Sequence, residues 1–476
     1  MVFSSVTFLF FFLPATIFLY HLLPRPARNP LLVLASLLFY TWGTGALVLA
    51  LIASIAANYA FGLWIERFAE QGRRSSAHAV LAVAVAMNVG LLAWFKYANF
   101  AVDTGSALLG ALGGSALVWQ DIILPIGISF YTFHSLSYLV DLLRGTARHL
   151  ANPIDFALYI TFFPQLVAGP IVRFHEIRDQ LVRRQETSGL FAAGVYRFGH
   201  GLGKKVIIAD TVAPIANAAF ATPTGELNTA TALIGVVAYT VQLYFDFSGY
   251  SDMALGLAQM FGIRLPENFN RPYAARSVTE FWRRWHMSLS RWFRDYLYIP
   301  LGGNRGSSAA TYRNLIIVFL VTGLWHGANW TFVVWGAYHG ALLLVERVTG
   351  VGRLEREGPW ALLGQARTVT LVMFGWILFR SVDLPYAAGY VNALLRPVGG
   401  LTPDVALALD PLAAVALAIG VASVAIPRWW VTGVRLEQAS SWTVRGLRLA
   451  TVGVVLPVAL VFMISGTFSP FLYFQF

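Results

Sequence analysis

The region that decides the fold is residues 276–340, which contains FWRRWHMSLSRWFRDYLYIPLGGNR (residues 281–305) and GLWHGANW (residues 323–330). Both stretches combine histidine or arginine with tryptophan, whereas the sequence on either side is mostly apolar. Lipid penalises ionisable groups at membrane depth, so a chain that places them there usually uses them. Chemistry is therefore expected first in this region.

The composition is that of a polytopic membrane protein. Of the 476 residues, 57% are hydrophobic and 12% are charged, compared with roughly 25% charged residues in a soluble domain. The apolar runs are continuous rather than alternating, which favours an all-α helical bundle over a transmembrane β-barrel. Because the chain has no cysteine, cysteine-ligated zinc, iron–sulfur clusters and a cysteine nucleophile are excluded. The sequence indicates no metal site and no bound cofactor.

The basic residues indicate how the chain lies in the membrane. The formal net charge is +11, and these residues fall in short connections between apolar runs, as in cytoplasmic loops. No soluble basic domain and no nucleic-acid-binding motif is evident in the sequence, so nucleic acid is not an expected partner. Residues 1–23 lack a basic start and a cleavage site, and the first arginine is Arg25. We expect a retained first span with its N-terminus outside the cytoplasm.

The apolar runs predict about eleven to thirteen membrane segments in one integral-membrane domain covering residues 1–476. Some of these segments should be re-entrant or interfacial. The run at 156–171 contains Pro164, Gly169 and Pro170, and these residues disfavour a lipid-facing helix because the freed backbone groups need protein partners. The weaker, glycine-rich stretch 101–120 is either a further span or surface. The predicted segments are approximately 5–23, 30–40, 45–64, 79–95, 124–143, 156–171, 191–208, 230–245, 315–324, 332–345, 369–379, 412–426 and 449–464.

The stretch 276–299 is predicted to be one helix, because it has no glycine or proline before Pro300. Its tryptophans recur at helical spacing on one face, and its arginines occupy the other. Placing five arginines at the bilayer centre would cost on the order of 10 kcal/mol. The helix should therefore lie along the interface or line a wet cavity.

Two histidines in the region are candidates for catalysis. His326 lies between Trp325 and Gly327 at the end of an apolar run, and we expect Gly327 to remove bulk beside the imidazole. Burial disfavours the charged form, so the ring should be neutral and able to accept a proton from an alcohol. His286 lies one helical turn after Trp282, at the edge of the aromatic face. For His339 a structural or supporting role is favoured.

Two carboxylates, Asp246 and Asp252, lie at or near membrane depth in FDFSGYSDMALG (residues 245–256). They could couple ion movement to function. Pairing with arginines inside the bundle is the favoured interpretation, because charged groups inside a membrane protein commonly pair.

In combination these stretches are similar to the membrane-bound O-acyltransferase family, in particular its bacterial polysaccharide O-acetylation branch. Further matching motifs cover most of the chain up to Gly340, whereas the sequence after about Thr349 shows only general hydropathy. The motifs outside the central region are MVFSSVTFLFFFLP (1–14), ILPIGISFYTF (123–133), FFPQLVAGPIVRF (162–174) and LPENFNRPY (265–273).

The resemblance implies an integral-membrane O-acyltransferase with a ring of helices around a central tunnel or funnel and a catalytic window at residues 265–340. An acyl group, in the first place acetyl, would move from a cytoplasmic thioester such as acetyl-coenzyme A towards hydroxyls of an exported polysaccharide such as alginate. His326 would be the general base, with His286 as the second catalytic position. Trp325 or Asn329 could stabilise the developing oxyanion. The expected location is the bacterial inner membrane, with a periplasmic acetyltransferase as partner.

Three arginines have two interpretations. Arg283, Arg284 and Arg291 could bind the phosphates of the thioester donor, or they could anchor an interfacial helix to anionic membrane lipid. An alternative function for the whole chain is a transporter or export channel without chemistry of its own, in which Asp246, Asp252 and the arginines line a path. Inverted repeats would favour a transporter, and none is evident in the sequence.

Overall fold

The computed structural model describes residues 1–351, 360–396, 399–425, 446 and 448–466. All regular elements in these ranges are helices, so the predicted all-α membrane fold is confirmed. Six described helical stretches are long and apolar enough to cross a membrane; the other predicted segments form shorter or less apolar helices. The six stretches are Arg25–Glu70, Arg74–Ala111, Thr229–Met260, Ser308–His326, Ala361–Arg380 and Arg448–Ser465.

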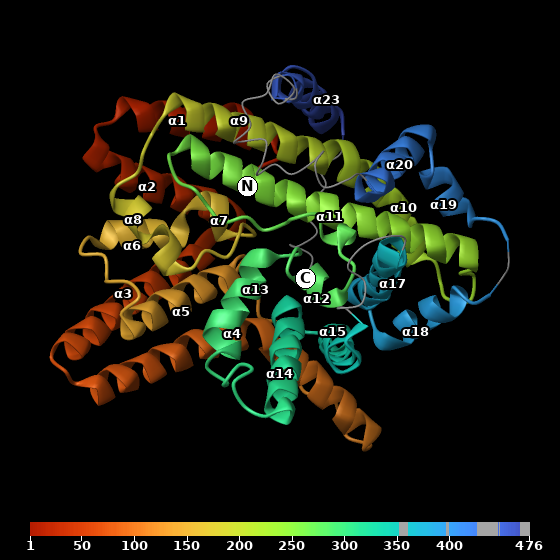
Figure 1. The fold of residues 1–476 in the computed structure, drawn as a ribbon, viewed down its shortest axis with the longest axis horizontal. Coiled ribbons are helices and arrows are strands. Elements are labelled where there is room, and N and C mark those ends of the chain that lie inside the picture. Colours follow the sequence, from red (N-terminus) through yellow and green to blue (C-terminus); the bar gives the residue numbers. More distant parts are fainter. Residues whose placement is uncertain (352–359, 397–398, 426–445, 447, 467–476) are drawn as a thin grey trace. The chain divides into compact units, whose positions relative to one another are not determined.

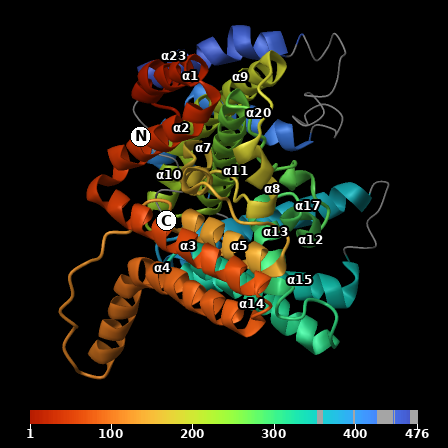
Figure 2. The same cartoon turned by 90° about the vertical axis from the view of Figure 1, so that its left-hand side faces the viewer.

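The chain divides into two compact units, and each is described by itself. The first consists of Met1–Phe191 with Leu257–Pro266, and the second of Ala192–Gly256 with Glu267–Phe476. In the first unit α3, α4 and α5 pack side by side (Figure 2). The helices of this unit are η1 (Phe8–Phe12), α1 (Leu13–Leu22), α2 (Arg25–Thr44), η2 (Gly45–Leu47), α3 (Val48–Glu70), α4 (Arg74–Ala111), α5 (Ile128–Arg144), α6 (Pro153–Thr161), α7 (Phe163–Leu166) and α8 (Phe174–Val182).

The predicted end of a span near residue 95, before a separate stretch at 101–120, is wrong. Residues 74–111 form the single helix α4, which ends before Gly113, a residue in the left-handed region with φ 81°. Glycines at 105 and 110 do not interrupt it, because a lone glycine in a helix costs only about 1 kcal/mol. By contrast, the proline-containing run at 156–171 is divided between α6 and α7 and is almost entirely buried, as predicted.

A long antiparallel helix pair dominates the second unit (Figure 1). One member runs without interruption through α9 (Ser188–Gly203), η3 (Lys204–Ala209) and α10 (Asp210–Ala221), and the other is α11 (Thr229–Met260). Glycine allows the backbones to approach closely: a Cβ at Gly201 would lie 2.5 Å from the Gly249 carbonyl oxygen. Small residues of this kind are common where membrane helices pack.

The second close pair is α14 (Ser308–His326) with α15 (Trp330–Thr349). A side chain at Gly323 would collide with the carbonyl of Phe332, and one at Gly336 with the carbonyl of Phe319. The remaining elements of the unit are η4 (Pro272–Ala274), α17 (Trp360–Arg380), α18 (Leu384–Ala393), α19 (Pro403–Ala408), α20 (Pro411–Ala425), η6 (Thr451–Val455) and α23 (Leu456–Ser465). Residue 426, the predicted end of the segment 412–426, lies outside the described residues.

The prediction of one helix over 276–299 is also wrong. The stretch forms α12 (Val278–Trp282), α13 (Met287–Phe293) and the π-helical η5 (Arg294–Tyr298). Between α12 and α13 the backbone bonds to a distant segment: Asn270 N donates to the Arg284 carbonyl (2.9 Å) and Met287 N to the Asn268 carbonyl (2.8 Å). These bonds replace intrahelical ones, and no glycine or proline is needed to end the helix.

Candidate active site

His326 is the last residue of α14 and is 7% exposed. Aromatic rings surround the imidazole: its centroid lies 4.9 Å from that of Trp325, 5.1 Å from Trp335 and 5.2 Å from Phe379. All three contacts are edge-on, and the partners come from α14, α15 and α17. The ring therefore lies in the apolar enclosure that its sequence context predicts.

The turn after His326 is fixed by Asn329. Its Oδ1 caps α15 by accepting from Thr331 N (3.0 Å), and its Nδ2 donates to the Val382 carbonyl (3.0 Å). Both polar atoms of the side chain are thus engaged in holding the turn. The expected reason for Gly327 needs correction, since the atoms nearest to a side chain there would be those of the Phe332 ring.

His286 lies between α12 and α13, where it is fully buried and precedes the first residue of α13. Its backbone is in the left-handed region (φ 45°, ψ 53°), which is uncommon for a residue with a side chain. The ring is 4.8 Å from that of Phe247 and 6.1 Å from that of Trp325. Trp325 therefore stands next to both candidate histidines.

The His286 environment favours the neutral ring. Burial lowers the pKa of His286 to about 3, because an apolar surrounding penalises the charged form. Nδ1 lies 3.0 Å from the side-chain oxygen of Asn268, while Nε2 has no hydrogen-bond partner within the described part of the chain.

His339 on α15 is enclosed by the same aromatic cluster. The Trp282 indole N–H donates to its Nδ1 (3.4 Å), and the Trp335 ring lies 5.0 Å away. Trp335 contacts both His326 and His339. This arrangement is the one expected of a residue that supports the aromatic enclosure.

The two aspartates pair with basic residues, as favoured from sequence, although lysine is the main partner. Asp246 lies 2.8 Å from the amine of Lys205. Asp252 accepts from Lys204 (2.6 Å) and from Arg197 (2.9 Å). The three basic partners lie on α9 and η3, and both aspartates lie on α11.

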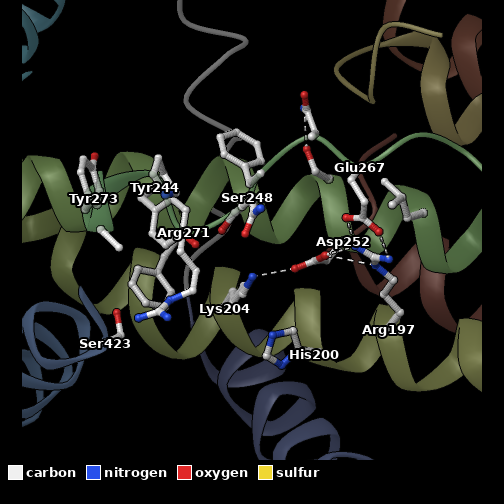
Figure 3. Close-up of a pocket in the computed structure, with 18 of the residues that line it drawn as sticks. Arg197, His200, Lys204, Tyr244, Ser248, Asp252, Glu267, Arg271, Tyr273 and Ser423 are labelled. Carbon is white, nitrogen blue, oxygen red and sulfur yellow. Dashed lines mark hydrogen bonds and ion pairs between the residues drawn. The ribbon is translucent and has the colours of Figure 1, made fainter. Parts of the chain in front are cut away.

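A cavity of about 180 Å³ opens beside the ion pairs of Asp252. Figure 3 shows Lys204, Asp252, Arg197 and Glu267 joined in one series along its wall, and Glu267 binds Arg197 through two bonds of 2.6 Å. Sequence reasoning missed Arg197, Lys204 and Glu267 as members of this network. The sequence signal that could have identified them is the presence of an ionisable residue within an otherwise apolar stretch.

A second cavity, of about 520 Å³, has an arginine-rich lining. Its lining residues include Arg283, Arg291 and Arg294 together with Trp282 and Phe319. Arg284 is not among the lining residues and pairs with Glu280 (2.6 Å). Of the three arginines considered together in the sequence, Arg283 and Arg291 therefore line one groove, and Arg284 forms an ion pair elsewhere. We call this cavity the arginine groove.

The model of the membrane-bound O-acyltransferase family matches residues 36–353. The chain belongs to this family. All the candidate residues lie within the matched range. A probable alginate O-acetylase AlgI of Azotobacter vinelandii is 48% identical over 392 residues, covering 81% of this chain and 76% of that protein.

Two further relatives of this membrane-bound O-acyltransferase cover most of its length. A probable alginate O-acetylase AlgI of Pseudomonas putida is 43% identical over an alignment of 498 residues that spans both proteins fully. A peptidoglycan O-acetyltransferase of Helicobacter pylori is 36% identical over 434 residues, covering 83% of this chain and 80% of that protein. The chain is thus a multi-pass membrane enzyme, an O-acetyltransferase.

The chemistry available to this O-acyltransferase comes from imidazole, indole and guanidinium groups. Across the ranges that the structure describes, no cluster of three or more histidine, aspartate or glutamate side chains is arranged to hold a metal ion. Neutral histidines can move protons, and buried N–H groups can stabilise an oxyanion. Both functions suit the transfer of an acyl group to a hydroxyl.

Proposed function

We propose that this O-acetyltransferase moves an acetyl group from a cytoplasmic thioester, acetyl-coenzyme A, towards hydroxyls of an exported polysaccharide such as alginate. The names of the relatives support a glycan as the final acceptor, because they include alginate O-acetylases and a peptidoglycan O-acetyltransferase. The enzyme would act in the bacterial inner membrane, with a periplasmic acetyltransferase carrying the group onward.

In this proposal His326 is the general base. Its imidazole removes the proton of the acceptor hydroxyl while the hydroxyl oxygen attacks the thioester carbonyl carbon. A tetrahedral oxyanion forms, the C–S bond breaks, and the sulfur leaves as a thiolate that takes up the proton. The observation that carries the assignment is the place of His326, at a helix end, ringed by aromatic side chains and next to a tryptophan shared with His286.

His286 and Trp325 would assist the same step. A neutral His286 can accept a hydrogen bond or a proton at Nε2. The Trp325 indole N–H could donate to the oxyanion, which is a strong source of rate enhancement in enclosed sites. Asn329 would act through the turn that it holds after His326 and not by direct contact with the acyl group.

The arginine groove is the proposed binding place for the thioester donor. The three guanidinium groups that line the groove suit the phosphates of coenzyme A. Thr322 also lines the groove and lies four residues, about one helical turn, before His326 on α14. One lining residue of the groove is therefore about one helical turn from the proposed base. Anionic membrane lipid is the competing occupant.

The test is acetyl transfer by His326→Gln and His326→Ala. Both should abolish acetylation of cell-surface glycan, measured by mass spectrometry, and should stop release of coenzyme A by the purified protein. The exposed His78 provides a control, and His78→Gln should behave like the wild type. Normal acetylation by folded His326→Ala protein would refute the assignment of the base.

A further inference from the structure

Two residues other than glycine have left-handed backbones in the described ranges, Arg271 (φ 47°) and His286 (φ 45°). They belong to two short segments that are hydrogen-bonded to one another. Asn270 N donates to the Arg284 carbonyl, and Met287 N donates to the Asn268 carbonyl. Backbone strain of this kind costs of order 1–3 kcal/mol per residue and clusters at functional sites. The pairing of these segments therefore suggests a function for the residues at its centre.

Asn268 is the centre of this pairing. It is 1% exposed, and every polar atom of its side chain is used. Its Oδ1 accepts from Ser288 N (3.3 Å) and Ser288 Oγ (2.8 Å) and lies 3.0 Å from His286 Nδ1. Its Nδ2 donates to Ser251 Oγ (3.0 Å). Ser251 lies on α11, so Asn268 connects His286 to the long helix pair.

These bonds determine the tautomer of His286. A backbone N–H can only donate, so the atom of Asn268 that faces Ser288 N must be the oxygen. The nitrogen of His286 that faces the same oxygen must then carry the proton. A neutral imidazole with a proton on Nδ1 presents an unprotonated Nε2. That atom lies in a ring next to Trp325 and has no hydrogen-bond partner in the described structure.

We propose that Asn268 is a positioning residue for acyl transfer, which holds His286 with Nδ1–H bonded to Oδ1 so that Nε2 faces the reaction as an acceptor. This inference rests on the proposed function, in which His286 assists His326. The other tautomer would place a hydrogen instead of a lone pair on Nε2, and a displaced ring would move that lone pair away from the reacting group. The competing interpretation is that Asn268 only closes a loop.

The test is a double-mutant cycle between Asn268 and His286 in the full-length protein, with release of coenzyme A from acetyl-coenzyme A as the assay. Asn268→Ala should lower kcat about 100-fold, as expected for a displaced catalytic group, and should leave the KM for acetyl-coenzyme A within about twofold. Asn268→Asp keeps an acceptor oxygen and should retain activity within about tenfold of wild type. Asn268→Ala with His286→Ala should be no slower than His286→Ala alone.

Asn314 gives a matched control. It is a buried asparagine that closes a loop by donating to the carbonyls of Leu301 (3.1 Å) and Gly303 (3.0 Å). Any loss caused by Asn314→Ala should add in full to the loss from His286→Ala. If Asn268→Ala does not accumulate in membranes, Asn268→Gln replaces it in the cycle, since the extra methylene displaces the acceptor oxygen.

The outcomes separate this inference from the proposed function. Additive losses for Asn268 and His286, or folded Asn268→Asp protein as inactive as Asn268→Ala, would overturn the positioning role while leaving the general base in place. Full activity of His286→Ala would overturn the supporting role of His286 and the inference with it. The His326→Gln variant tests the general base independently of both results.

Discussion

Removing the Asp252 carboxylate should destabilise the protein more than removing the Lys204 amine, although the two groups form one ion pair. Within the described residues Asp252 is the only ion-pair partner of Lys204, at 2.6 Å, whereas Asp252 also binds Arg197 at 2.9 Å. Breaking a buried pair costs about 3–5 kcal/mol when the remaining charge is uncompensated. The two side chains are 18% and 15% exposed, so Asp252→Ala should cost about 3 kcal/mol, at the lower end of that range.

Lys204→Met should cost less, about 1–2 kcal/mol, because Asp252 keeps the guanidinium of Arg197. Both variants are compared in detergent by the midpoint of thermal unfolding at one fixed scan rate, since membrane proteins commonly unfold irreversibly. Asp210→Asn is the matched control: Lys205 pairs with Asp210 (2.6 Å) and also with Asp246 (2.8 Å), so one partner remains. The reasoning is refuted if Asp252→Ala protein unfolds at the wild-type midpoint. Loss of activity at that unchanged midpoint would favour an ion path instead.

Three further predictions concern the histidine, the helix contact and the arginine groove. The folded protein should lose stability as the pH falls from about 6.5 towards 3. Burial lowers the pKa of His286 to about 3, so in this range the unfolded chain binds more protons than the folded protein. His286→Asn should reduce this loss, measured by thermal unfolding at pH 7.5 and at pH 5. Gly336→Val should prevent accumulation of folded protein, since its side chain would enter the backbone of α14, whereas Gly189→Val, in open space, should be detected at wild-type level by immunoblot. Arg283→Ala should raise the KM for acetyl-coenzyme A about tenfold with little change in kcat, which corresponds to a loss of about 1.4 kcal/mol of binding free energy. Substitution of the exposed Arg305 by alanine should leave the KM unchanged. An unchanged KM for Arg283→Ala would instead support the lipid-anchor interpretation.

The fold class could be predicted because it depends on local composition. Continuous apolar runs and rare charges specify membrane helices wherever they pack. The buried prolines of residues 156–171 were interpretable for the same reason, since a freed carbonyl needs a protein partner at any membrane depth. The pairing of Asp246 and of Asp252 with basic residues could also be predicted, because an uncompensated charge inside a membrane protein is costly. That cost does not indicate whether the partner is lysine or arginine.

The environment of the second histidine could not be predicted, because it depends on residues distant along the chain. The sequence around Arg284 and His286 has no helix breaker, and local propensity favours one helix there. Asn268, 18 residues before His286, interrupts that helix by bonding to its backbone and ring. Periodicity contains no information about such a contact. A sequence motif such as LPENFNRPY can mark the residue, but only the structure shows which atom it binds.

The position of His326 at a helix end has a consequence for the proposed mechanism. When the imidazole accepts the hydroxyl proton, a positive charge forms in an aromatic enclosure that would otherwise penalise it. His326 is the C-terminal residue of α14, a helix of 19 residues. The carbonyl end of a helix carries a partial negative charge, which stabilises a nearby cation by about 0.3–1 kcal/mol. In partly buried sites this stabilisation reaches about 2 kcal/mol. Electron-rich ring faces nearby act in the same direction when a cation lies over them. A neutral ground state and a tolerated cation are the two properties that a general base in a membrane needs, and the helix end contributes to the second.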